Sequence, residues 1–138
     1  MLDARELPHL SGFLERPCLS GMHIIYIAIT LLAAAANSYA AWLNFVGAES
    51  VKGVADRLHL SQTWMIPLGI LLASGAAGLS IGFAVPELGK AAAIGLILYF
   101  ICALGAHIRA RDAQIGGAVM FLVLGVAALI ANVVYHSH

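Results

Sequence analysis

The sequence predicts an all-α integral membrane protein, built as a bundle of four transmembrane helices. Of its 138 residues, 62% are hydrophobic and only 10% are charged, and the mean hydropathy is +0.94. Soluble domains carry about a quarter charged residues, so this composition excludes an ordinary soluble domain. Four apolar runs are each long enough to cross a bilayer, which takes about 20 residues of helix. The lipid bilayer is therefore the first partner that the sequence predicts.

The chain begins with an arm, residues 1–21, that carries charges of both signs and two prolines. This pattern does not fit the basic, uninterrupted start of a signal peptide, so we expect no cleaved targeting segment. Apolar side chains recur in the arm at steps of three and four residues: Leu7, Leu10, Phe13 and Leu14. That spacing predicts a short interfacial helix on the membrane surface, and a frayed tail is the alternative.

The membrane domain, residues 22–138, contains the four spans. They are predicted over about residues 22–45, 63–83, 90–109 and 114–135. Ser61 is a suitable N-cap for the second span, and Pro86 and Gly89 are expected to stop it. Between the first two spans, apolar residues alternate with charges at roughly helical spacing, which predicts an amphipathic turn at the interface. Four spans place both termini on one side of the membrane.

Several classes of function are excluded by what the sequence lacks. The formal net charge is zero and no basic block is present, so nucleic acid is not an expected partner. Cys18 and Cys102 lie far apart and form neither a disulfide framework nor a metal knuckle, and no H-E-x-x-H helix is present, so no metal site is predicted. No acidic residue lies within a predicted span, which argues against a carboxylate-based proton pump.

A polar stripe runs down the first span. Its members are separated by three, four, seven and seven residues, which places them within about 60° of one another on a helix: His23, Tyr26, Thr30, Asn37 and Asn44. Hydrogen-bonding groups are costly against acyl chains, so the stripe is expected to face the bundle interior. Two interpretations stay open, namely interhelical hydrogen bonds that hold the bundle together, or the polar wall of a ligand-binding cavity.

His107 is the candidate acid or base, because it lies near the end of the third span and its charge changes near neutral pH. Arg111 follows four residues later and is expected to project from the same side of the helix, so we count it as a candidate ligand-binding residue. The alternatives are, for His107, a histidine that caps helix carbonyls or lies at the level of the lipid headgroups and, for Arg109 and Arg111, anchors to lipid phosphates.

Small residues form ridges on two of the spans. Ser74, Gly78 and Gly82 recur at four-residue intervals on the second span, and Gly117 and Gly125 flank Phe121 on the fourth. Ridges of this kind let a neighbouring backbone come close, either within the bundle or between the protomers of a homo-oligomer.

These residues together resemble the DoxX-like family of small four-helix membrane proteins. The resemblance rests on three segments in order: Trp64–Gly69 with the glycine ridge Gly75, Gly78, Leu79 and Gly82; Pro86 to Ala93; and Ala103–Arg109, which ends in A-H-x-R at His107 and Arg109. The region of Asn37 and Asn44 resembles actinobacterial members. The sequence departs from many relatives at Leu71 and Leu72, where they place a charged residue near the start of helix two.

The resemblance implies a bacterial plasma membrane protein and a family with few defined functions. Some relatives are membrane subunits associated with thiosulfate:quinone oxidoreduction, and others are linked to oxidative-stress complexes. The missing charge at Leu71 and Leu72 counts against any role that requires it, including the redox role.

Three hypotheses for function follow. The leading one is a bundle that holds a lipophilic small molecule, quinone-like or isoprenoid- or polyketide-like, against the polar stripe and His107, as an accessory oxidoreductase subunit. The second is a membrane-embedded isomerase, cyclase or hydrolase that uses His107 as acid or base, with Tyr26, Asn37 or Asn44 donating to an oxyanion. The third is a structural assembly partner of another membrane protein. The sequence leaves open whether the protein is an enzyme.

Overall fold

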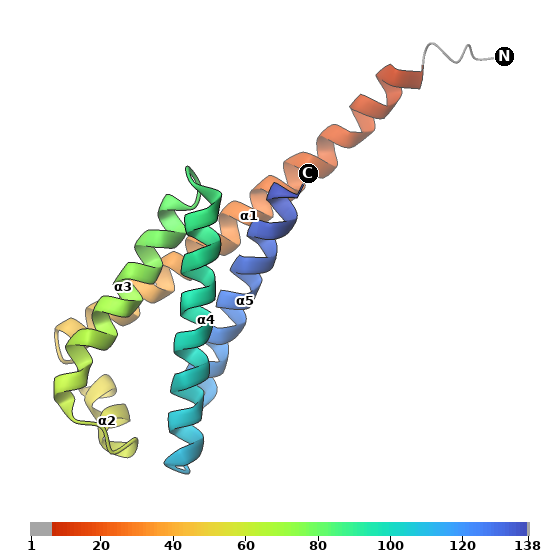
Figure 1. Cartoon of the computed structure of the whole chain (residues 1–138). Helices are drawn as coiled ribbons and strands as arrows, with labels where there is room; N and C mark the ends of the chain where they lie inside the picture. Colours follow the sequence, from red (N-terminus) through yellow and green to blue (C-terminus); the bar gives the residue numbers. More distant parts are fainter. Residues whose placement is uncertain (1–6, 138) are drawn as a thin grey trace.

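A computed structural model describes the backbone of residues 7–137 and the side chains of residues 20–137. It contains five α-helices and one short 3-10 turn (Figure 1): α1 (Leu7–Phe45), α2 (Glu49–Arg57), η1 (Gln62–Trp64), α3 (Met65–Ile81), α4 (Pro86–Arg109) and α5 (Gly116–His136). Four segments are long and apolar enough to cross a membrane: Ser20–Phe45, Gln62–Ile81, Pro86–Arg109 and Gly116–His136. The predicted all-α membrane bundle is therefore confirmed.

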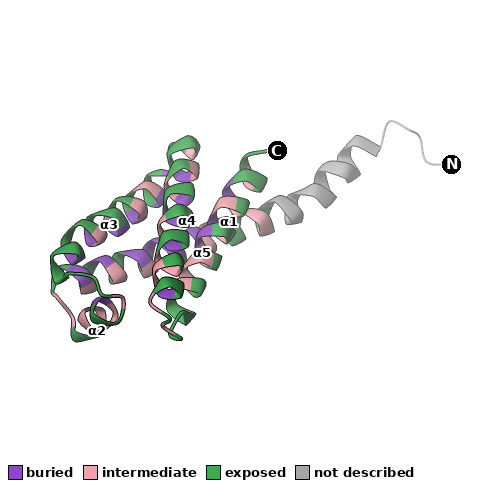
Figure 2. Cartoon of the chain, turned by 60° about the horizontal axis from the view of Figure 1, so that its bottom comes forward, coloured by how far each residue is buried: buried purple, intermediate pink, exposed green. Residues whose placement is uncertain are grey.

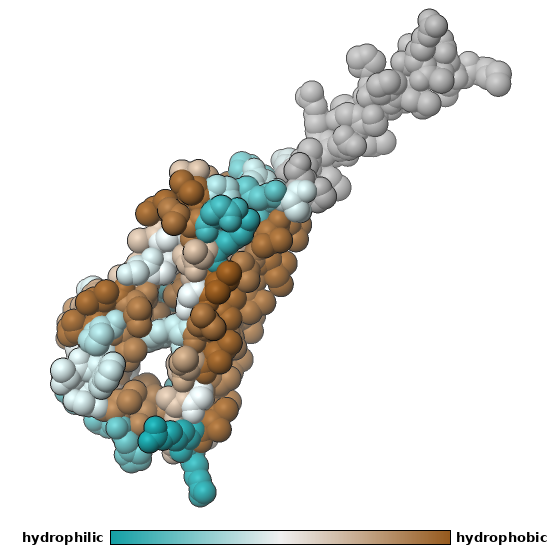
Figure 3. All heavy atoms as spheres, viewed as in Figure 1, coloured by the Kyte–Doolittle hydropathy of each residue, from teal (hydrophilic) through white to brown (hydrophobic). Residues whose placement is uncertain are grey.

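The four long helices pack in a ring in the order α1, α3, α4, α5, so that each contacts two others. Alanines and a few leucines fill the centre of this ring, including Ala33, Ala93, Ala128, Leu79 and Leu96. The outer faces carry exposed isoleucine, leucine and valine side chains along the bundle (Figures 2 and 3). Such a surface matches acyl chains and is costly in water, as expected of helices surrounded by lipid.

The bundle has two distinct ends. At the terminal end, the start of the α1 span, the last turn of α5 and the turn between α3 and α4 come together. At the loop end lie α2, η1 and the turn between α4 and α5.

Glycines bring α3 and α4 into backbone contact near the terminal end. A Cβ placed on Gly82 would lie 2.6 Å from the Cα of Gly89, and one on Gly78 would lie 2.6 Å from the Cβ of Ala92. The predicted ridge on the second span therefore packs within the bundle. Ser74 does not take part, because it is exposed and donates to the carbonyl of Ile70.

Towards the loop end the same two helices lie further apart. Figure 1 shows α3 and α4 diverging below their glycine contact, and the space-filling view in Figure 3 shows a hollow between them. The amphipathic turn predicted between the first two spans is α2, which lies at this open end with Ala55 buried.

Two boundaries differ from the sequence prediction. Pro86 does not stop a helix but begins α4, four residues before the predicted start of the third span. Proline suits the first helical position because its missing N–H would have no partner there, and it holds the preceding Val85 in an extended conformation. Ser61 caps η1 rather than α3 directly, since its Oγ accepts from the Thr63 N–H at 3.4 Å.

The predicted boundary at residue 21 is not a break in the backbone. The structure assigns residues 7–21 to the same helix as the first span, because α1 is continuous from Leu7 to Phe45. The side chains of residues 1–19 lie outside the described part of the chain, so the interfacial position of this arm stays a prediction.

Candidate functional site

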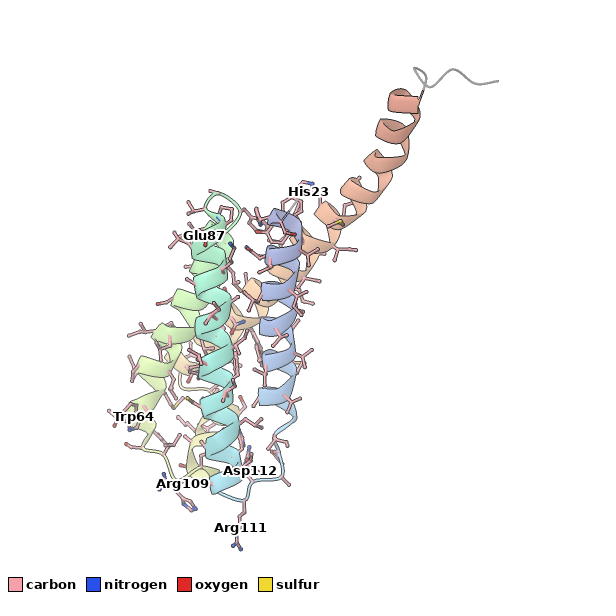
Figure 4. All side chains as sticks on the ribbon, turned by 45° about the vertical axis from the view of Figure 1, so that its right-hand side comes forward. His23, Trp64, Glu87, Arg109, Arg111 and Asp112 are labelled. Carbon is pink, nitrogen blue, oxygen red and sulfur yellow. The ribbon has the colours of Figure 1, made fainter. Side chains whose placement is uncertain are left out.

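The polar stripe of α1 faces the bundle interior. Tyr26, Thr30, Asn37 and Asn44 are buried, and the Asn37 side chain is only 1% exposed. His23 is the exception, because it lies exposed at the terminal end (Figure 4). The stripe therefore presents its hydrogen-bonding groups inward, whereas a role in ligand binding stays a prediction.

The two stripe asparagines do not join helices to one another. Asn37 and Asn44 each donate 2.8 Å hydrogen bonds to the carbonyl four residues earlier on their own helix, at Ala33 and Ala40. In the described part of the chain, Thr30 Oγ1 and Asn37 Oδ1 are buried without a partner. Buried polar atoms are almost always paired. These two are exceptions, and each can still accept a hydrogen bond inside the bundle.

At the terminal end, by contrast, the stripe does join helices. Asn132 of α5 donates from Nδ2 to the Tyr26 hydroxyl at 3.4 Å, and that hydroxyl donates to the Gly82 carbonyl at 3.4 Å. Tyr26 links α1, α5 and the end of α3 in this way. The third buried atom without a partner in the described residues is Asn132 Oδ1.

Aromatic rings surround the Tyr26 hydroxyl. Tyr26 stacks on Tyr135 with ring centroids 4.8 Å apart and planes at 10°, and His23 stacks on Tyr135 at 5.4 Å. Phe83 and His136 meet Tyr26 edge-on. His136 Nδ1 lies 2.9 Å from the carbonyl of Asn132, and because a carbonyl only accepts, Nδ1 carries the proton and Nε2 is left free to accept in the neutral ring.

A groove of about 400 Å³ begins at these rings and runs between α1 and α5. Its wall is apolar, formed by residues such as Ile25, Ile29, Ala127 and Ala131, and it ends at Tyr26 and Tyr135. We call it the α1–α5 groove. A second groove of about 400 Å³ lies between α1 and α3 and is lined mainly by alanine and serine, with Trp42 and Phe45 beside them.

His107 lies at the loop end and is held by a carboxylate. Its Nδ1 is 2.9 Å from Asp112 Oδ2, and the two side chains are only 8% and 6% exposed. Arg57, at the end of α2, places Nε 3.4 Å from the same Asp112 oxygen. Asp112 Oδ1 accepts from the Gln114 N–H at 3.1 Å. One carboxylate thus binds a histidine, an arginine and a backbone amide.

Asp112 is held in its ionised form. The Gln114 N–H and the hydrogen bonds from His107 and Arg57 keep the pKa of this carboxyl below its ordinary value of 3.8. Because an ionised carboxylate only accepts, His107 must donate from Nδ1. The Nε2 atom of His107 then carries the lone pair when the ring is neutral.

The end of α4 explains why Asp112 reaches His107. The Asp112 N–H bonds to the His107 carbonyl and the Arg111 N–H to the Ile108 carbonyl, which is the Schellman pattern of a helix end. Arg111 takes the left-handed conformation that this pattern requires, with φ of 55°. The helix therefore turns back at Arg111 and directs Asp112 towards His107.

This geometry corrects the prediction for Arg111. Because α4 ends at Arg109, Arg111 does not continue the helical spacing, and its side chain points away from the bundle rather than sharing a side with His107 (Figure 4). Arg109 is also exposed. Whether Arg111 binds a ligand or, like Arg109, anchors to lipid phosphates stays a prediction.

The candidate residues fall at two separate places. Tyr26 touches Gly82, which packs on Gly89, and His107 follows Gly89 by 18 residues on α4. At 1.5 Å per residue the two candidates lie about 27 Å apart along the bundle. A compact molecule cannot contact both, so the leading hypothesis loses His107 as a contact of a ligand bound at Tyr26, and the second hypothesis loses Tyr26 as a partner of His107.

Sequence reasoning missed five residues of these two places. Asn132, Tyr135 and His136 belong to the fourth span, where Asn132 and His136 stand four residues apart in an otherwise apolar run, a signal like that of the first span. Arg57 and Asp112 carried no comparable signal, because their pairing depends on how α2 and α4 end. Among the described side chains, those of residues 20–137, no group of three or more histidine, cysteine or acidic residues is placed to hold a metal ion.

The comparison with known proteins agrees with the fold. Residues 28–132 match the model of the DoxX-like family, which is well over half of the chain. Neither the curated proteins nor the solved structures give a match. With four apolar helices long enough to cross a membrane, this chain belongs to the DoxX-like family of integral membrane proteins.

Proposed function

We propose that this DoxX-like protein holds a lipophilic small molecule with a flat, polar, quinone-like head in the α1–α5 groove. The observation that carries the proposal is that the apolar groove ends at the stacked rings of Tyr26 and Tyr135. The Tyr26 hydroxyl and Asn132 add hydrogen-bonding groups at this end. Ligand sites in proteins are mostly apolar, with a few polar groups that fix the orientation of the ligand.

The groove favours a ligand that comes from the membrane. Its wall lies between two outer helices whose exposed side chains face lipid, so an isoprenoid or polyketide tail would exchange one apolar environment for another. Ala127 and Ala131 have small side chains that leave room for a ligand on the α5 side of the groove, and they offer no polar group. Specificity for such a molecule must therefore come from the polar end.

The polar end offers both donors and acceptors to a head group. The Tyr26 hydroxyl sits in long 3.4 Å hydrogen bonds that a ligand could replace, and Asn132 Oδ1 has no partner in the described residues. The stacked rings of Tyr26 and Tyr135 provide flat surfaces for a conjugated ring. A quinol hydroxyl or a quinone carbonyl fits these groups.

We assign the protein an accessory rather than an independent role in redox chemistry. Electrons gained or lost by a bound quinone need a second redox partner, and another membrane subunit would provide it. The bundle itself would orient the quinone and exclude water. The association of some relatives with thiosulfate:quinone oxidoreduction supports this assignment, while the missing charge at Leu71 and Leu72 counts against it.

Native mass spectrometry of protein extracted gently from its own membrane tests this proposal. We expect a stoichiometric quinone or similar lipid, identified after organic extraction, in the wild type. Ala131→Leu should lose it, because the larger side chain fills the groove, while Ala35→Leu on an exposed site of α1 should keep it.

Two results would contradict the proposal. Equal retention of the molecule by Ala131→Leu and Ala35→Leu would place it outside the α1–α5 groove. A protein that carries no small molecule but a stoichiometric second polypeptide would instead be an assembly component.

A further inference from the structure

We propose that the loop end is a second, independent site, in which His107 Nε2 exchanges a proton with a lipophilic carbonyl compound and the Arg57 guanidinium stabilises the oxyanion that forms. The α1–α5 groove and its ligand play no part in this site. The proposal rests on two contacts with one oxygen atom of Asp112, because both Arg57 Nε and His107 Nδ1 lie within hydrogen-bonding distance of Oδ2.

The imidazole is fixed in the orientation that a base requires. Asp112 receives the Nδ1 proton at 2.9 Å, and the backbone turn at Arg111 holds Asp112 in place. A buried carboxylate that binds one ring nitrogen fixes the tautomer and stabilises the imidazolium formed when the other nitrogen takes a proton. Asp112 is therefore a positioning residue.

The second ring nitrogen is open. None of the described residues makes a hydrogen bond to His107 Nε2, and this atom is not among the fully buried side-chain atoms without a partner in that part of the chain. At least part of the 8% exposed fraction of this side chain therefore belongs to Nε2. A small molecule can approach it there.

Arg57 provides a positive charge at the same carboxylate that binds the base. Its Nε binds Asp112 Oδ2, the same oxygen that receives the His107 proton, while its side chain is 41% exposed. The remaining guanidinium N–H groups are available to an oxygen atom of a substrate. A base and a cationic donor next to each other are the two groups needed to remove a proton from the carbon beside a carbonyl.

The step balances without a further reactant. The C–H bond next to the carbonyl breaks, its proton bonds to Nε2, and the electron pair forms an enolate whose oxygen binds Arg57. The imidazolium then either returns the proton to another carbon, which isomerises the ketone, or exchanges it with solvent water and returns a solvent proton to the same carbon, which gives the exchanged ketone. No oxidant or reductant is consumed, and the ring of His107 ends as it began.

The position of the site favours a lipophilic substrate. His107 lies in the last turn of a membrane span, and α3 and α4 separate towards the loop end, where Figure 3 shows the hollow between them. A molecule dissolved in the bilayer can enter between diverging helices more readily than where Gly82 and Gly89 are in contact.

Chemical modification tests whether Nε2 is open. Diethyl pyrocarbonate modifies unprotonated imidazole nitrogens, and mass spectrometry of the digested protein reports each histidine separately. We expect His107 to react in the wild-type protein, with the exposed His59 as the internal reference. A His107 that stays unmodified while His59 reacts would overturn the proposal.

Proton exchange tests the chemistry. The probe is 2-undecanone in detergent micelles in D₂O, and the readout is deuterium incorporation next to its carbonyl. General-base catalysis is worth about a hundredfold or more, so His107→Asn should lose at least about that factor. Asp112→Asn and Arg57→Gln should each lose about tenfold or more, because an oxyanion donor or a base orienter contributes that much or more.

The controls separate this result from misfolding. His59→Asn changes an exposed histidine of the same loop region in the same way, and should exchange deuterium at the wild-type rate. Arg57 is partly exposed, so Arg57→Gln is expected to fold even if Asp112→Asn does not. Wild-type exchange no faster than that of His107→Asn, or an equal loss in His59→Asn, would overturn the assignment.

Discussion

At the terminal end of the bundle, Tyr26 and Asn132 are neutral groups that share long hydrogen bonds within a stack of aromatic rings. At the loop end, the charged Asp112 side chain pairs with Arg57 and also binds His107. The packing of α3 on α4 also differs between the two ends. The helices are in backbone contact near Tyr26, at Gly82 and Gly89, and they diverge towards His107.

In the two roles proposed above, this difference separates recognition of a head group from proton transfer. Neutral donors and acceptors beside an apolar groove can bind a head group without the cost of burying a charge in the membrane. The charged groups are found where the last turns of the helices meet the interface, so their charge is less costly there. One small bundle therefore places two kinds of polar chemistry about 27 Å apart along α4.

The tight contact at the terminal end should be the most sensitive to substitution. Gly82→Ala places a Cβ 2.6 Å from the Gly89 Cα, so α3 and α4 must separate, and we expect the free energy of unfolding to fall by about 1–3 kcal/mol. Gly95→Ala on α4 meets nothing within 4 Å and should be neutral or stabilising by about 0.5 kcal/mol. Unfolding in detergent mixtures measures both. Equal effects would remove the distinction in packing.

The hydroxyl of Tyr26 should matter less than the glycine contact. Tyr26→Phe leaves the Asn132 amide without its acceptor and should lower the free energy of unfolding by about 1 kcal/mol, since both hydrogen bonds are long. Tyr39→Phe makes the same change on an exposed ring of α1 and should be neutral. The comparison fails if Tyr26→Phe is as stable as Tyr39→Phe.

The loop end should respond to acid. Because the pKa of Asp112 is lower in the folded protein than its ordinary value, its ionised form stabilises the fold above that value, and this contribution disappears as the pH falls below about 4. Asp112→Asn should therefore lose less thermal stability than the wild type between pH 6 and pH 3. Glu49→Gln, at an exposed carboxylate of α2, should follow the wild-type curve. If the thermal stability of Asp112→Asn depended on pH as that of the wild type does, the ionised form of Asp112 would not stabilise the fold.

The smallest effects are expected from surface ion pairs, one at each end. Glu49 pairs with Lys52 at 3.1 Å and Glu87 pairs with Lys90 at 2.6 Å, and both carboxylates are exposed. Water screens such pairs, so Glu49→Gln and Glu87→Gln should each change the free energy of unfolding by less than about 0.5 kcal/mol. A larger loss at either end in the same unfolding assay would mean that the first turns of α2 and α4, and not only the two sites, contribute to the difference in stability between the ends.

Hydrophobic length and periodicity are sufficient to predict most of this fold. The four spans and α2 follow from apolar runs and from alternation of charge, since lipid forces each run to form a helix. The inward direction of Tyr26, Thr30, Asn37 and Asn44 follows from their spacing for the same reason. Pro86 was harder to interpret, because proline both follows helix ends and occupies first helical positions.

The site residues were less predictable because they depend on how elements end and meet. The pairing of Asp112 with His107 needs Arg111 in the left-handed conformation, which is more typical of glycine, so no spacing rule indicates it. The pairing of Tyr26 with Asn132 joins residues 106 positions apart, and only the packing of α1 on α5 brings them together.

Photolabelling with an azidoquinone that carries an isoprenoid tail tests the central claim most directly, because it maps the ligand onto the chain. Digestion and mass spectrometry should find the label on residues 22–29 of α1 and 127–135 of α5, and unlabelled quinone should compete it away. Label around His107, or spread evenly over the outer faces of the bundle, would contradict the assignment of the α1–α5 groove as the site.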